Sequence, residues 1–163
     1  MTRATVIEGV VVVAAGSLLH FTYEWSGENA LVGLVTPVNE SVWEHTKLVV
    51  VPLVVVGVVG FVRTRRVGEL WGTLAGAVVG ALLLPLVFYG YTGAFGVGNI
   101  LWVDLLSFVG VVATALAVKN RLARVDADRL PSPWLAVAGL VLILVLVALA
   151  TLAPPDLPLF TAP

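Results

Sequence analysis

The sequence predicts an all-α fold, a polytopic membrane bundle of five transmembrane helices. Of the 163 residues, 60% are hydrophobic and only 12% are charged, whereas soluble domains carry about 25% charged residues. The mean hydropathy is +1.06. Five apolar stretches reach the length of about 20 residues that a helix needs to cross the hydrocarbon core of a bilayer. Because lipid offers no hydrogen-bond partner to the backbone, each stretch is expected to form a helix.

The predicted spans follow one another along a single domain at 1–153. Their valine-rich runs are too long for strands and lack the alternation of polar and apolar residues that strands show. An apolar segment at 30–35 is too short to cross the bilayer, so we expect it along the outer surface or dipping back in. A proline-rich external tail at 154–163 ends the chain. The spans are placed near 4–24, 41–63, 68–90, 99–119 and 132–153.

The placement of lysine and arginine predicts the orientation of the bundle. Eight of the nine fall on one side of a five-span topology, and the exception is Lys47. Positive charge is enriched in cytoplasmic loops, so the N-terminus is expected to be cytoplasmic and the C-terminus outside. The residues on the positive side are Arg3, Arg63, Arg65, Arg66, Lys119, Arg121, Arg124 and Arg129.

Composition also limits the partners and the chemistry. The net charge of −1 gives no strong attraction for nucleic acid, so no nucleic-acid partner is expected. The absence of cysteine excludes disulfides and thiolate metal ligands. The lipid bilayer is the partner that the composition predicts.

The third span carries glycines at every fourth position, a spacing that lets another helix approach closely. Packing within the bundle is the simpler interpretation. Contact with a second copy or with another membrane protein is the alternative. The glycines are Gly68, Gly72, Gly76 and Gly80.

Ionisable residues near the ends of three spans are the most informative feature for function, because charge inside a membrane is costly and usually functional. His20 and Glu24 are four residues apart and share a face of the first helix. Glu44 and His45 begin the second span, and Asp104 lies near the start of the fourth. At about 1.5 Å of rise per residue, the groups on the three helices fall roughly 7 Å below the outer surface. We therefore expect an outward-facing polar pocket between the first, second and fourth spans.

A cation is the occupant that these side chains favour, either a divalent metal or a proton shared among carboxylates. Histidine and carboxylate groups are ligands for zinc, manganese and iron. Such a site could support transport, sensing or hydrolysis, and no catalytic string such as His-Glu-x-x-His identifies one reaction. The candidate metal ligands are His20, Glu24, Glu44, His45 and Asp104, with supporting polar groups at Tyr23, Asn39, Glu40, Ser41, Lys47 and Ser107.

Two other interpretations of the cluster stay open. In the first, the protein is a non-catalytic accessory or scaffold protein whose polar groups pack helices or grip a partner, with Glu40 or Glu44 paired to Lys47 and a histidine paired to Asp104. In the second, the two histidines are axial ligands of a b-type haem.

One string in the chain is specific enough to suggest a family. It reads Pro37-Val38-Asn39-Glu40-Ser41-Val42-Trp43-Glu44-His45, and it follows His20-Phe21-Thr22-Tyr23-Glu24-Trp25. The pair resembles an uncharacterised family of small prokaryotic multi-pass membrane proteins. The resemblance implies a membrane location and brings no activity with it.

Overall fold

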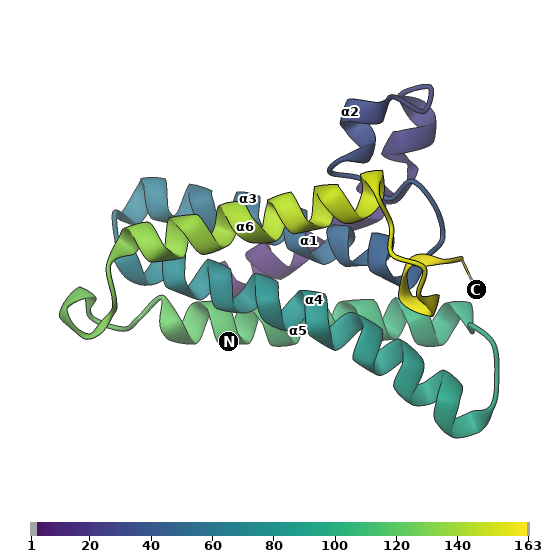
Figure 1. Ribbon diagram of the computed structural model, residues 1–163. Coiled ribbons are helices and arrows are strands. Elements are labelled where there is room, and N and C mark those ends of the chain that lie inside the picture. Colours follow the sequence, from purple (N-terminus) through teal and green to yellow (C-terminus); the bar gives the residue numbers. More distant parts are fainter. Residues whose placement is uncertain (1–2, 163) are drawn as a thin grey trace.

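The computed structural model describes residues 3–162, and these form helices and no strand (Figure 1). Five of the helices are long and apolar enough to cross a membrane, which confirms the predicted all-α class with five spans. The helices are α1 (Arg3–Trp25), α2 (Ala30–Gly33), α3 (Val42–Thr64), α4 (Val67–Phe95), α5 (Leu101–Leu122) and α6 (Pro133–Leu152), with short 3-10 turns η1 (Ala127–Arg129) and η2 (Pro158–Phe160).

Local sequence signals explain where these helices begin and end. The Ser41 side chain accepts from the Glu44 backbone N–H and caps α3, as serine commonly does at a helix start. The α4 helix runs past its predicted end at 90 and stops at Gly96, whose φ of +62° is a left-handed conformation that favours glycine. The apolar segment at 30–35 contributes only the single turn of α2, which Asn29 caps.

The expected external tail folds back onto the bundle. The Phe160 ring in η2 lies 5.1 Å from the Trp43 ring at the start of α3, measured between centroids. The end of the chain therefore covers part of the segment that carries His45.

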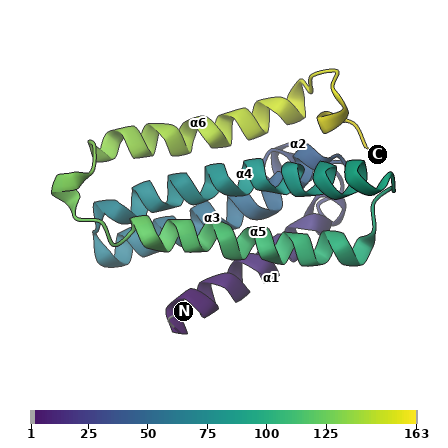
Figure 2. The ribbon, with the colours of Figure 1, turned by 90° about the horizontal axis from the view of Figure 1, so that it is seen from below.

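The long helices lie side by side, with α4 against α3, α5 and α6. Helix α1 packs on α3 and α5, and its N-terminal part diverges from the bundle (Figure 2). We call the end that contains His20, His45 and α2 the histidine end. The opposite end, with Arg65 and Arg124, is the arginine end.

Three glycines of α4 lie against the backbone at α5 and its C-terminal end, and Gly80 packs against the Val49 side chain of α3. A Cβ atom added at Gly68 would lie 2.7 Å from the Ala123 carbonyl oxygen, and one at Gly76 would lie 2.8 Å from that of Ala115. At Gly72, the added atom would collide with the Lys119 carbonyl oxygen. The glycines are thus used for packing inside the bundle, and a homo-oligomer through this face stays a prediction.

A buried charge cluster joins three helices at the arginine end. Lys119 on α5 is fully buried and lies 3.3 Å from Glu8 on α1 and 3.1 Å from Glu69 on α4. The Asn120 side chain donates a further hydrogen bond to Glu8, at 3.0 Å. From the sequence, Lys119 serves only to predict orientation. In the structure, its ion pairs connect α1, α4 and α5.

The glycine contacts predict a position-specific loss of stability. Gly72→Ala removes a poor helix former, but the new methyl group meets the α5 backbone, and such overpacking costs about 1–3 kcal/mol. Gly90→Ala on the same helix is the matched control, because a Cβ atom there meets nothing within 4 Å. Thermal unfolding in detergent is expected to show a lower melting temperature for Gly72→Ala and an equal or higher one for Gly90→Ala. Equal melting temperatures for the two variants would contradict the close approach of α4 and α5.

Candidate functional site

A buried lysine shapes the loop that leads into α3. The Lys47 side chain is fully buried, and its ammonium group donates to the carbonyl oxygens of Gly33 (2.8 Å) and Thr36 (3.0 Å). It also donates to Glu44 Oε2 at 2.7 Å. All three N–H groups of the ammonium therefore donate hydrogen bonds within the protein. A buried charge needs such partners because it has lost its contact with water. The segment between α2 and α3 is held down onto the α3 helix as a result.

The Glu44 carboxylate completes this arrangement. Its Oε2 accepts from the Val38 backbone N–H at 2.9 Å, and its Oε1 accepts from the Thr151 hydroxyl of α6 at 2.8 Å. The ion pair with Lys47 thus connects the loop, α3 and α6. Because both of its oxygens accept hydrogen bonds within the protein, the Glu44 carboxylate has a structural role.

Helix α1 approaches α3 closely enough to bring the two histidines together. An added Cβ atom at Gly16 would collide with the Leu48 carbonyl oxygen and lie 2.8 Å from Phe108 Cζ. One turn further along α1, His20 Nε2 lies 3.3 Å from His45 Nε2 on α3. The close approach at Gly16 therefore sets the distance between the histidines.

Glu40 supplies a carboxylate to the same place from the loop before α3. Its Oε2 lies 3.4 Å from His45 Nε2 and 3.7 Å from His20 Nε2. The three ligand atoms all lie within 4.8 Å of one another, the separation expected of a group that could hold a metal ion. The histidine side chains are 32% and 26% exposed and that of Glu40 is 69% exposed, so the group can be reached from outside. We call His20, Glu40 and His45 the histidine–carboxylate cluster.

The backbone fixes which nitrogen of His45 carries a proton. His45 Nδ1 lies 2.8 Å from the Ser41 carbonyl oxygen, which can only accept a hydrogen bond, so Nδ1 is the donor. In the neutral ring, Nε2 then presents its lone pair to His20 and Glu40. A ring nitrogen held in this way by a bond at the opposite nitrogen is typical of histidine metal ligands.

Two of the three distances in the cluster equal those expected around a tetrahedral ion, and the third, between His20 and Glu40, is longer. With zinc–nitrogen bonds of about 2.0–2.1 Å and zinc–oxygen bonds of about 2.0–2.2 Å, two nitrogens lie about 3.3 Å apart and an oxygen about 3.4 Å from each. The observed separations are 3.3, 3.4 and 3.7 Å. The side chains are therefore close to a ligating arrangement.

A pocket of about 540 Å³ adjoins the cluster. His20, Glu40 and His45 form one part of its lining, and Phe88 and Phe108 belong to its apolar part. Polar groups from α1, α5 and the loop before α5 also line it, namely Ser17, Asn99, Asp104 and Ser107. The cluster therefore faces a space that a water molecule or a small solute can enter.

The structure brings some of the proposed ligands together and separates others. His20 and His45 meet, and Glu40, expected only in a supporting role, is the carboxylate beside them. Glu44 is bound to Lys47, which is the pairing that the packing interpretation anticipated. Glu24 is exposed, and among residues 3–162 it has no ion-pair partner.

Asp104 lines the pocket at a distance from the cluster and accepts a hydrogen bond from the Tyr91 hydroxyl at 2.6 Å. Among the other supporting residues, Asn39 accepts from the Ser41 backbone N–H at 2.8 Å and so shapes the loop around Glu40. Tyr23 packs near Gly33, where an added Cβ atom would lie 3.1 Å from Tyr23 Cε2.

Comparison with protein families places the chain in one without an assigned role. A family model described as a family of unknown function, DUF6512, matches residues 2–162, so the chain belongs to that family. No curated protein and no solved structure matches the chain.

The Lys47–Glu44 pair predicts a large effect of removing one charge alone. Lys47→Met leaves the buried Glu44 carboxylate without its cation, and breaking a buried pair on one side costs roughly 3–5 kcal/mol. We expect a strong loss of folded protein in detergent, measured by size-exclusion chromatography and thermal unfolding. The double variant Lys47→Met/Glu44→Gln is expected to recover part of that loss, because no buried charge is left. A single variant as stable as the wild type would show that the pair does not hold the loop.

Proposed function

We propose that this family member binds one divalent transition-metal ion, zinc in the first place, at His20, Glu40 and His45. The observation that carries the proposal is the convergence of three ligand atoms from α1, the α2–α3 loop and α3 within 4.8 Å. Two neutral nitrogens and one carboxylate oxygen form a ligand set that zinc accepts readily.

The ligand chemistry favours zinc over other occupants. Imidazole nitrogens suit zinc, whereas magnesium and calcium prefer oxygen ligands alone. Axial ligands of a haem lie on opposite sides of the iron, about 4 Å apart across the macrocycle. The same side chains can share a proton, and metal binding would displace it.

An open coordination position distinguishes this site from a closed structural one. Structural zinc sites have four protein ligands, whereas sites with three keep a place for water or substrate. The pocket beside the cluster gives that place access to a solute, and Asp104 and Ser107 add polar groups to its wall. We therefore propose that the metal meets a water molecule or a solute, as hydrolysis, sensing or cation transfer requires, and that it does more than brace helices.

The location belongs to the same proposal. Five apolar helices support a multi-pass membrane protein, and the asymmetry of lysine and arginine supports a cytoplasmic arginine end. The histidine–carboxylate cluster would then lie in the outer leaflet of a prokaryotic cell membrane.

Metal retention tests the proposal directly. The detergent-purified protein is incubated with zinc and desalted, and bound metal is measured by elemental analysis. We expect about one zinc ion per chain for the wild type, as a three-ligand site would hold. His20→Ala and His45→Ala are expected to lose the ion, and Glu40→Gln to bind at least about tenfold more weakly.

Glu24→Gln is the matched control, because it removes an exposed carboxylate one turn further along α1 without touching the cluster. It should retain metal like the wild type, and in the absence of zinc all variants should unfold at similar temperatures. Equal zinc in the wild type and in His20→Ala/His45→Ala would refute the proposal. A Soret band in the visible spectrum of the wild type would favour haem in its place.

A further inference from the structure

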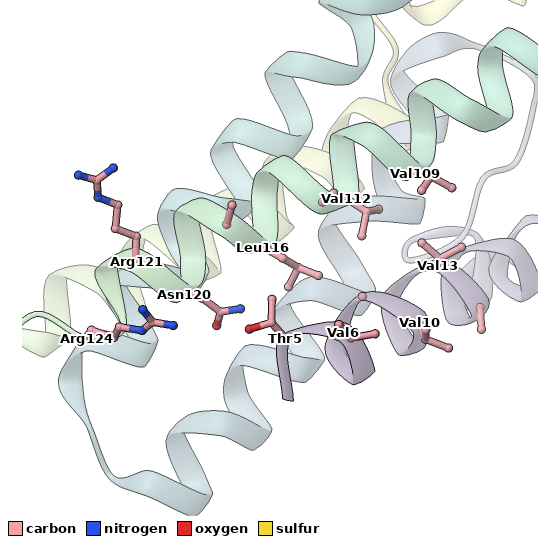
Figure 3. Close-up of a pocket in the computed structure, with 14 residues that line it drawn as sticks. Thr5, Val6, Val10, Val13, Val109, Val112, Leu116, Asn120, Arg121 and Arg124 are labelled. Atoms are coloured by element: carbon pink, nitrogen blue, oxygen red, sulfur yellow. The ribbon is translucent and has the colours of Figure 1, made fainter. Parts of the chain in front are cut away.

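A second, larger cavity lies between α1 and α5, toward the arginine end (Figure 3). Its volume is about 860 Å³, and none of its lining residues belongs to the pocket beside the histidine–carboxylate cluster. Apolar residues from both helices form most of its wall, among them Val6, Val10 and Val109. An apolar furrow of this kind on a membrane-spanning bundle faces lipid.

Small residues on both helices explain why the furrow exists. Gly9 and Ala14 on α1 face Ala113 and Ala117 on α5 along its length. At Gly9, an added Cβ atom would be 3.7 Å from Leu116 Cδ1, so the helices leave room here that α4 and α5 do not leave at their glycines. Toward its N-terminus, α1 diverges from the other helices (Figure 2).

One end of the furrow is positively charged. Asn120, Arg121 and Arg124 contribute to its lining there. The Arg124 guanidinium points toward Asn120, whereas that of Arg121 extends away from α1 (Figure 3). Within residues 3–162, neither arginine has an ion-pair partner. The nearby carboxylate of Glu8 is already engaged by Lys119 and Asn120. Two guanidinium groups are thus available to an anion from outside the protein.

The length of the furrow suits a lipid chain. From Val109 to its last residue, Leu122, α5 rises by about 20 Å. One leaflet of the hydrocarbon core is about 15 Å deep, so a headgroup held at the arginines would place its acyl chain along the valines. A zwitterionic lipid would bring its own ammonium group close to the two arginines, which repel it, and a free anion would leave the apolar furrow unfilled.

We propose that this furrow binds an anionic phospholipid, with its phosphate group at Arg121 and Arg124 and one acyl chain between α1 and α5. The guanidinium group suits this role because its planar set of donors matches two phosphate oxygens. The proposal is independent of the metal site, since the two share no residue.

Native mass spectrometry of the full chain in mild detergent tests it, with phosphatidylglycerol and phosphatidylcholine titrated separately. The wild type is expected to bind one phosphatidylglycerol at least about tenfold more tightly than phosphatidylcholine. Arg121→Gln/Arg124→Gln should lose this preference. Arg63→Gln/Arg65→Gln is the matched control, because it removes the same charge from the same end outside the furrow, and it should keep the preference.

A second pair of variants tests the apolar part. Ala113→Trp fills the furrow without changing any charge and should weaken lipid binding, whereas Val141→Trp on the exposed face of α6 should not. The proposal is overturned by equal affinity for the two lipids, or by an equal effect of the two arginine pairs. Displacement of the lipid by inorganic phosphate alone, or a second copy of the chain bound where the lipid should be, would also overturn it.

Discussion

The ammonium group of Lys47 is the interaction on which the histidine end depends. Carbonyl groups between α2 and α3 would face an apolar bundle without donors, and an unsatisfied polar group there is costly. Lys47 donates hydrogen bonds to two of these carbonyls, and Glu44 accepts one from the Val38 N–H. These bonds hold the loop against the first turns of α3. Only in that position does the loop bring the Glu40 carboxylate to His20 and His45.

The path of α1 links the two regions of interest. At Gly16, the helix meets the backbone of α3, which sets the spacing of the histidines one turn later. Toward its N-terminus the helix diverges, and Glu8 holds it near Lys119 of α5. The same inclined helix therefore produces a tight cluster at one end and an open furrow toward the other.

The spans and the meeting of His20 with His45 could be predicted from the sequence, because hydropathy and helical rise are properties of single segments. The partners of each carboxylate could not be predicted. Glu44 is held partly by Thr151, far away in the chain, and Asp104 by Tyr91 in an α4 helix longer than predicted. Glu40 reaches the histidines through a loop fold that no periodicity encodes. The signal that pointed to the true arrangement was the i, i+3 spacing of Glu44 and Lys47, which pairs them on one helical face.

The bond from His45 to Ser41 has a consequence for how this site tolerates change. The acceptor is a main-chain carbonyl oxygen, which every amino acid possesses, so replacing the serine side chain weakens the helix cap but leaves the imidazole tautomer as it is. Substitutions at position 41 therefore leave the lone pair on His45 Nε2 in place. An imidazole held by a side-chain acceptor would lose its fixed tautomer when that residue is replaced.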